Sequence, residues 1–316
     1  MQNQSLPPAI FLMGPTASGK TALSVQLAQA LGGEIISVDS ALVFKGMDIG
    51  TAKPTAEERA GIPHHLMDIL EPWQSYSTGQ FRHQALSLMN DITERGKIPI
   101  LVGGTQLYFN ALFNGLAELP VANLEIRRQL DNDLIQFGKE VLHQRLALVD
   151  PLAAARIHPN DPQRVQRALE VYEISGQSLS SFFKSQVDNE LPYQAIKLII
   201  APSDRKILHD IIAQRFRAML AQGFVEEVQG LYQRGDLNEL MPSMRAVGYR
   251  QVWAYLQGID EIDVMTEKAI IATRQLAKRQ FTWLRRVTDA ISFQTGQENL
   301  LAEVMALVNT QLCMKD

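Results

Sequence analysis

The sequence is almost without cysteine. Cys313, close to the C-terminal end, is the single cysteine among 316 residues, which excludes an internal disulfide and a Cys-rich zinc site. No apolar stretch is long enough to span a bilayer, and the first residues lack the basic segment of a secretory signal. These absences predict a protein of the reducing cytoplasm with no membrane partner, and we expect it to be a monomer.

The chain also lacks a strong net charge. It carries 30 Lys and Arg residues against 34 Asp and Glu residues, a formal net charge of -4. Such a chain has no global attraction for nucleic acid or for an anionic membrane, so a polyanion must bind at a local basic surface. The hydrophobic content of 46% is enough for a large buried core.

Short apolar runs indicate the fold class. They predict buried parallel strands at residues 9–13, 34–39, 98–104 and 195–201. Helical periodicity predicts helices at about residues 19–31 and 78–95, and helices from the fourth strand to about residue 286.

The connection between the third and fourth strands is too long to lack structure of its own. We therefore expect an α/β protein with a P-loop NTPase-like parallel-sheet core, a helical insertion domain and a helical C-terminal region. The core is formed by residues 1–120 and 191–316, and the insertion by residues 121–190.

The sequence GPTASGKT follows the first predicted strand and precedes the first predicted helix, which is the context expected of a P-loop. In a P-loop, backbone N–H groups and the helix N-terminus point at a phosphate, and the lysine adds a positive charge. The predicted phosphate-binding residues are Gly14, Pro15, Thr16, Ala17, Ser18, Gly19, Lys20 and Thr21. The hydroxyl of Thr21 is the candidate magnesium ligand.

The P-loop alone does not identify the reaction, because phosphate binding serves hydrolysis, phosphoryl transfer and displacements in which diphosphate leaves. Asp39, at the end of the second predicted strand, is a candidate general base; the alternatives are a magnesium ligand in a kinase or NTPase and a cap of the strand end. The third strand ends in Gly-Gly-Thr without an acid. Two further alternatives are a prenyltransferase for free adenine nucleotides and a non-catalytic RNA-binding module.

A series of motifs covers nearly the whole chain in one order: GPTASGKT, ISVDSALVFKGMDIGTAKP, PHHLMDI, LVGGTQLYFNAL, HPNDPQR, RAVGYRQ and TRQLAKRQFTWLRR. This series resembles bacterial tRNA dimethylallyltransferases. Members of that family transfer the dimethylallyl group from dimethylallyl diphosphate to N6 of adenosine 37, beside the anticodon, in tRNAs that read codons beginning with U.

The resemblance implies catalytic roles for Asp39, Thr16 and Lys20. Asp39 would accept the proton of N6, Thr16 would lie near the bridging oxygen of the leaving group, and the P-loop with Lys20 and Mg²⁺ would bind the diphosphate. Arg215 would be a second cation on the diphosphate, although a solvated helix face explains it equally well. An adenine amine is a weak nucleophile, so a proton acceptor, a neutralised leaving group and exclusion of water all favour the reaction.

Two segments are candidates for binding tRNA. On a helix at about residues 266–286, Arg274, Lys278 and Arg285 fall within about 40° of one another, and no acid occurs from residue 273 to 287. In the insertion, Arg164 and Arg167 are i,i+3 neighbours, flanked by glutamines whose amides suit base edges. The predicted tRNA-binding residues, most of them implied by the resemblance, are Asp39, Ser40, Ala41, Leu42, Thr105, Arg127, Gln163, Arg164, Val165, Gln166, Arg167, Arg245, Gly248, Tyr249, Arg274, Lys278 and Arg285.

Other polar residues receive no catalytic role. His64 and His65 have no partner at metal-ligand spacing and are expected to be core or loop histidines. Lys53 lies in a loop of small residues that could line the allyl or tRNA side of the site. The target adenosine must leave its stack to reach Asp39, so the reaction requires a base-flipping step and a channel open at both ends.

Overall fold

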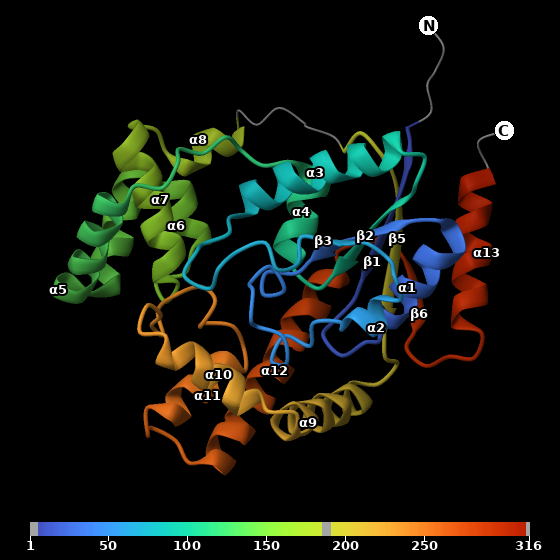
Figure 1. Cartoon of the computed structure of the whole chain (residues 1–316). Coiled ribbons are helices and arrows are strands. Elements are labelled where there is room, and N and C mark those ends of the chain that lie inside the picture. Colours follow the sequence, from blue (N-terminus) through green and yellow to red (C-terminus); the bar gives the residue numbers. More distant parts are fainter. Residues whose placement is uncertain (1–5, 185–190, 314–316) are drawn as a thin grey trace, which may run out of the picture. The chain divides into compact units, whose positions relative to one another are not determined.

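The computed structural model describes residues 6–184 and 191–313. By its internal contacts the chain divides into two compact units, Met1–Phe113 with Leu191–Asp316, and Asn114–Glu190. The second unit therefore begins before residue 121, the boundary expected from the sequence. Figure 1 shows the elements of both units. None of the described helices combines the length and the apolar character needed to cross a membrane.

The first unit is built on a six-stranded parallel sheet with the order β3-β2-β4-β1-β5-β6. The strands are β1 (Pro8–Met13), β2 (Glu34–Val38), β3 (His64–His65), β4 (Pro99–Gly103), β5 (Gln194–Ala201) and β6 (Ile291–Gln294). The four predicted strands are confirmed as β1, β2, β4 and β5. The edge strands β3 and β6 were not predicted, because β3 has two residues and β6 is largely exposed.

Helices cover both faces of this sheet. The helices of the first unit are α1 (Lys20–Leu31), α2 (Ala56–Arg59), α3 (Thr78–Glu94), α4 (Gln106–Asn114), α9 (Arg205–Ala221), α10 (Phe224–Gln233), α11 (Tyr249–Leu256), α12 (Ile262–Leu284) and α13 (Leu300–Cys313). α1 and α13 pack on one face, where Leu27 and Val304 lie against Leu12. α3 and α4 pack on the other face, where Phe81 and Phe109 share a core with Phe11.

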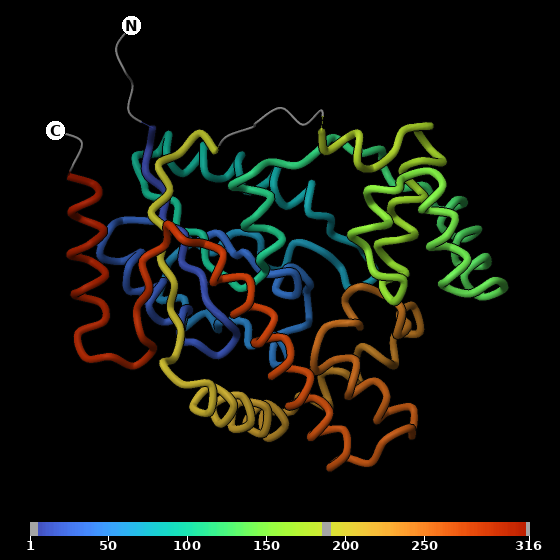
Figure 2. Tube along the Cα trace, turned by 180° about the vertical axis from the view of Figure 1, so that it is seen from behind, coloured from blue at the N-terminus to red at the C-terminus, as the bar shows by residue number. Residues whose placement is uncertain are grey.

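The helices α9 to α12 form a separate core with the loop that follows β2. Val43, Phe44 and Met47 of this loop are buried among residues of these helices, including Phe224 and Tyr249. Figure 2, which views the trace from behind, shows the four helices gathered beside the sheet. This packing brings a helical layer next to the strand ends at which ligand sites of α/β sheets form.

The second unit is helical, as predicted. Its helices are α5 (Leu124–Val149), α6 (Pro151–Arg156), α7 (Pro162–Ser175) and α8 (Leu179–Lys184). α5 is interrupted at Gly138, whose φ of 82° and ψ of 168° are not helical. Leu130, Leu146 and Val165 belong to a core that is formed within this unit.

Candidate active site

The P-loop runs from the end of β1 to the first turn of α1. Ala17 and Gly19 adopt positive φ angles of 62° and 81°, which turn the chain sharply before the helix. At Gly14 a side chain is excluded, because a Cβ atom would lie 2.2 Å from the carbonyl oxygen of Ile200 in β5. The strand-loop-helix arrangement that the motif requires is therefore present.

Lys20 folds back onto its own loop. Its ammonium Nζ donates to the carbonyl of Pro15 (2.6 Å) and to Ser18 Oγ (3.2 Å). Burial lowers the pKa of Lys20 to about 7, the negative charge of Asp39 acts to raise it, and the charge of Arg215 acts to lower it. An ammonium group that is partly shielded from water and hydrogen-bonded only to neutral partners is stabilised by an anion, so Lys20 favours binding of a phosphate group at this loop.

Asp39 follows β2 and uses one of its two carboxylate oxygens to hold the local turn. Oδ1 accepts from the backbone N–H groups of Ala41 (2.8 Å) and Leu42 (3.4 Å). Within the described part of the chain no donor is bound to Oδ2. One oxygen therefore fixes the side chain, and the other is left to accept a proton.

Arg215 projects from α9 toward the same place. Burial lowers the pKa of its guanidinium, whereas the charges of Asp39 and Glu58 raise it. The charge of Asp39 thus acts on the pKa of both Arg215 and Lys20. Two cationic side chains and one carboxylate therefore lie near one another although they are remote in sequence.

These groups line one cavity of about 800 Å³ in the first unit. Of the residues predicted from the sequence, the cavity is lined by Thr16, Ala17, Ser18, Gly19, Lys20, Thr21, Asp39, Ser40, Ala41, Leu42, Thr105, Arg215, Arg245 and Gly248. Gly14 and Pro15 are buried at the base of the loop. The structure therefore brings together the predicted phosphate-binding residues and the predicted base.

Gln280 of α12 also lines this cavity and was not predicted. Its Oε1 accepts from the backbone N–H of Thr16 (2.8 Å), and its Nε2 donates to the carbonyl of Gly104 (3.0 Å). In the sequence this glutamine stands within a run of basic residues, which indicates a charged surface helix and gives no sign of a contact with the P-loop. Thr105, beside Gly104, accepts from the backbone N–H of Ser40 through its Oγ1 (3.2 Å).

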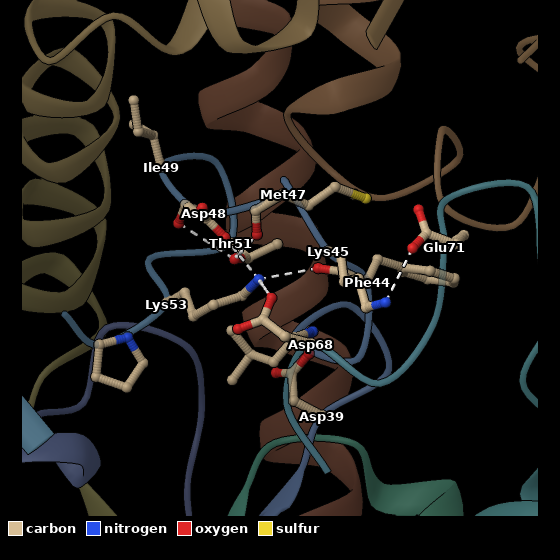
Figure 3. A network of polar contacts seen from close by, with 12 residues as sticks. Asp39, Phe44, Lys45, Met47, Asp48, Ile49, Thr51, Lys53, Asp68 and Glu71 are labelled. Carbon is tan, nitrogen blue, oxygen red and sulfur yellow. Dashed lines mark hydrogen bonds and ion pairs between the residues drawn. The ribbon is translucent and has the colours of Figure 1, made fainter. Parts of the chain in front are cut away.

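A network of polar contacts fixes the loop between β2 and α2, one wall of the cavity (Figure 3). Lys53 is buried and donates to the carbonyl of Phe44 (2.9 Å), to Asp48 (2.6 Å) and to Asp68. Lys53 is bonded to a carbonyl and a carboxylate of its own loop and to Asp68, which follows β3, so it serves as a structural cation that joins the two segments.

Glu227 of α10 holds the same loop from the other side. Its carboxylate accepts from the backbone N–H groups of Asp48 (2.9 Å), Ile49 (2.7 Å) and Gly50 (3.2 Å). The hydroxyl of Tyr249 donates to Oε1 of the same carboxylate (2.5 Å). Glu227 therefore ties the cavity wall to the helical layer, and no local pattern in the sequence indicates this.

Two of the predicted tRNA-binding residues of the first unit are not freely exposed. Tyr249 is completely buried and its hydroxyl is held by Glu227, so its ring is not available for stacking on a base. Arg274 is half-buried and donates to the carbonyl of His209 (3.4 Å), because its position on α12 faces α9. Lys278, Arg285 and Arg245 are exposed, as surface contacts with RNA require.

In the second unit, the predicted tRNA-binding residues fall into two groups. Arg127 and Arg167 both form ion pairs with Glu170, a buried carboxylate (2.9 and 2.6 Å). Gln163 and Arg164 are exposed.

The next two residues of α7, Val165 and Gln166, are not free at the surface. Val165, predicted to bind tRNA, faces inward on α7 and is buried in the core of the unit, so its side chain is not available to RNA. Gln166 donates to Asp131 (2.8 Å).

The donor set determines how a metal could be held. Among residues 6–184 and 191–313, no three His, Cys, Asp or Glu side chains are placed to hold a metal ion. His65 contacts Glu34 (2.8 Å), and Nδ1 of His64 donates to the carbonyl of Ile62 (2.8 Å), so both histidines have structural partners. Thr21 faces the cavity. A single hydroxyl fits magnesium that keeps several waters and is held mainly by phosphate oxygens.

The fold and the cavity define the class of P-loop NTPase-like α/β proteins. Within that class, the family described as IPP transferase matches residues 42–287, and the family described as isopentenyl transferase matches residues 8–68. The chain belongs to the IPP transferase family of tRNA prenyltransferases. The tRNA dimethylallyltransferase of Methylococcus capsulatus is 57% identical over 300 residues, which cover 95% of this chain and 96% of the relative.

Solved structures agree with this assignment. The tRNA isopentenylpyrophosphate transferase of Bacillus halodurans has 36% identity and a TM-score of 0.72, over 98% of this chain and 97% of the other. A eukaryotic dimethylallyltransferase acting on tRNA has 29% identity and a TM-score of 0.84, over 98% of this chain and 80% of the other. The fold thus recurs in proteins with 36% and 29% identity to this chain, well below the 57% of the Methylococcus capsulatus relative.

Proposed function

We propose that the chain transfers the dimethylallyl group from dimethylallyl diphosphate to N6 of adenosine 37 in tRNAs that read codons beginning with U. The observation that carries this proposal is that the P-loop, two half-buried cationic side chains, Lys20 and Arg215, and the free oxygen of Asp39 line one cavity. Relatives at 57% identity that are tRNA dimethylallyltransferases support the same reaction.

The leaving group binds at the P-loop. As the bond between C1 of the allyl group and the bridging oxygen breaks, the electron pair moves to the diphosphate. Backbone N–H groups of the loop, Lys20 and Arg215 stabilise this charge. Thr16 faces the same cavity and lies near the bridging oxygen in this proposal.

Asp39 acts on the acceptor. The N6 nitrogen forms a bond to C1 and loses a proton, which Oδ2 of Asp39 accepts. Because Oδ1 is held by the N–H groups of Ala41 and Leu42, the carboxylate reaches the acceptor in a fixed orientation. Free diphosphate and N6-prenylated adenosine are the products, so atoms and charge balance.

Magnesium fits the proposed reaction as a partner of the diphosphate. Thr21 would hold the ion together with the phosphate oxygens, and its positive charge would neutralise part of the leaving group. Lys20 and Arg215 supply the remaining positive charge from the protein itself.

tRNA binds in this proposal through exposed cations and through backbone near Asp39. On the first unit, Lys278, Arg285 and Arg245 contact phosphates, and Ser40, Ala41 and Leu42 lie beside the flipped adenosine. On the second unit, Gln163 and Arg164 are the exposed contacts, and the guanidinium groups on Glu170 offer their remaining N–H donors. An adenosine in a single-stranded loop is cheaper to flip than one in a duplex.

One assay tests this function against its alternatives. The protein is incubated with dimethylallyl diphosphate, magnesium and unmodified tRNA, and the digested tRNA is analysed by mass spectrometry for N6-prenylated adenosine. ATP and AMP are offered in parallel reactions. We expect product on the tRNA alone. Product on AMP would identify an adenine-nucleotide prenyltransferase, and ATP turnover without prenylation would identify a kinase or NTPase.

A further inference from the structure

Gln280 joins the two sides of the cavity. Its side-chain amide spans from the P-loop to the turn after β4, accepting from Thr16 N–H (2.8 Å) and donating to the carbonyl of Gly104 (3.0 Å). The residue is 6% exposed, so water competes little for either bond. One amide group thus satisfies a donor on the leaving-group side and an acceptor on the other side.

Further hydrogen bonds connect the turn at Gly104 to the segment that carries Asp39. Thr105 follows Gly104, and its Oγ1 accepts from the N–H of Ser40, the residue after Asp39. The backbone N–H of Thr105 also donates to the carbonyl of Val38, the residue before Asp39 (3.2 Å). The turn that Gln280 holds is therefore bonded on both flanks of Asp39.

A second observation concerns the space that the amide of Gln280 occupies beside Gly104. A Cβ atom at Gly104 would lie 2.5 Å from Nε2 of Gln280, which is closer than atoms in contact approach. Only glycine at this position leaves room for the amide, although the backbone of Gly104 does not require a positive φ. The glycine and the glutamine thus form one fitted contact.

We propose that Gln280 is a positioning residue that sets the separation between the diphosphate cradle and Asp39. The inference rests on the proposed prenyl transfer. Because a displacement needs the attacking nitrogen, the allylic carbon and the leaving oxygen in line, a shift of about 1 Å lowers the rate by about 100-fold. The amide acts through Thr16 and Gly104 and does not itself touch the reacting atoms.

The test replaces Gln280 by methionine, which keeps the length and volume and removes both hydrogen bonds. We expect the single-turnover rate of prenyl transfer to fall at least tenfold, with tRNA affinity unchanged and KM for dimethylallyl diphosphate altered less than threefold. Gln275→Met is the matched control, because Gln275 lies exposed on the same helix, and it should retain the wild-type rate. The single-turnover rate constants are measured with enzyme in excess over tRNA and at saturating dimethylallyl diphosphate, so that a smaller folded fraction does not change the rate constant.

Gly104→Ala is the second variant, and it perturbs the same contact from the other partner. We expect a similar loss of rate, and a double variant with Gln280→Met that loses less than the product of the two single effects. A wild-type rate in Gln280→Met, or a loss confined to tRNA affinity, overturns the inference. Failure of the proposed function is distinguishable, because in that case the wild-type protein itself forms no prenylated tRNA.

Discussion

Asp39 is the residue whose replacement separates chemistry from structure most cleanly. Its Oδ1 accepts two backbone N–H groups, and its Oδ2 is left for the substrate. In Asp39→Asn, the amide oxygen can still accept from Ala41 and Leu42, while the amide nitrogen in place of Oδ2 cannot accept a proton. Asp39→Ala removes both functions.

The two variants should therefore agree in activity and differ in stability. A positioned general base contributes about 100-fold to 10,000-fold to a rate, which corresponds to about 3 to 5 kcal/mol of activation free energy. Asp39→Asn should lose this contribution with almost no change in the free energy of unfolding. Asp39→Ala should lose it as well, and should also lose about 1 to 2 kcal/mol of stability from the unsatisfied turn.

The assay is single-turnover prenyl transfer to tRNA at saturating dimethylallyl diphosphate, together with urea denaturation of the same preparations. tRNA affinity, measured by filter binding, serves as the control for an intact surface. A rate of Asp39→Asn within threefold of wild type would refute the assignment of Asp39 as the base. A rate loss that appears in Asp39→Ala alone would show that the carboxylate serves only the turn.

Three further predictions concern charged side chains of the cavity, of its wall and of the exposed surface. Burial lowers the pKa of Lys20 to about 7, so the side chain of Lys20 is mostly neutral at pH 8 in the free protein. Bound dimethylallyl diphosphate favours the charged ammonium form. Calorimetry in buffers of different ionisation enthalpy should therefore show that a proton is taken up on binding. Affinity for the diphosphate should accordingly fall as the pH rises above about 7, and Lys20→Arg should show no uptake; absence of uptake in the wild type contradicts this. Glu227→Gln should lower the free energy of unfolding, measured by denaturant titration, by about 2 kcal/mol, because the carboxylate accepts from three backbone N–H groups. The control Glu226→Gln, at an exposed position, should change the free energy of unfolding by less than about 0.5 kcal/mol. Equal effects of the two substitutions would contradict the assigned contact. Lys278→Ala with Arg285→Ala should weaken tRNA binding and reduce the slope of log K against log salt by about 1 to 2; an unchanged slope would show that these cations do not contact phosphates.

The sequence was sufficient for the core of the fold and for the local part of the site. Buried parallel strands appear as continuous apolar runs, and the P-loop is a contiguous motif whose geometry depends on its own residues. Lys20 could be found because it belongs to this motif, and Asp39 because it directly follows a predicted strand. The two-residue strand β3 and the exposed strand β6 have too little apolar periodicity to be recognised.

The remaining site residues depend on contacts between segments that are remote in sequence. Gln280 reaches Thr16 across the fold, and Glu227 reaches the loop at Asp48, so neither has a local pattern. The same cause explains the wrong assignment of Tyr249, whose hydroxyl is satisfied inside the protein by Glu227. A polar or aromatic residue in a motif can serve the scaffold, and only its partners in three dimensions reveal this.

The most direct test of the account is a crystal structure of the protein with tRNA and an unreactive thio analogue of dimethylallyl diphosphate. We predict the diphosphate on the residue 14–21 loop, beside Lys20 and Arg215, and N6 of adenosine 37 about 3 Å from Oδ2 of Asp39. A diphosphate bound away from this loop, or an N6 atom beyond hydrogen-bonding distance of Asp39, would contradict the central claim.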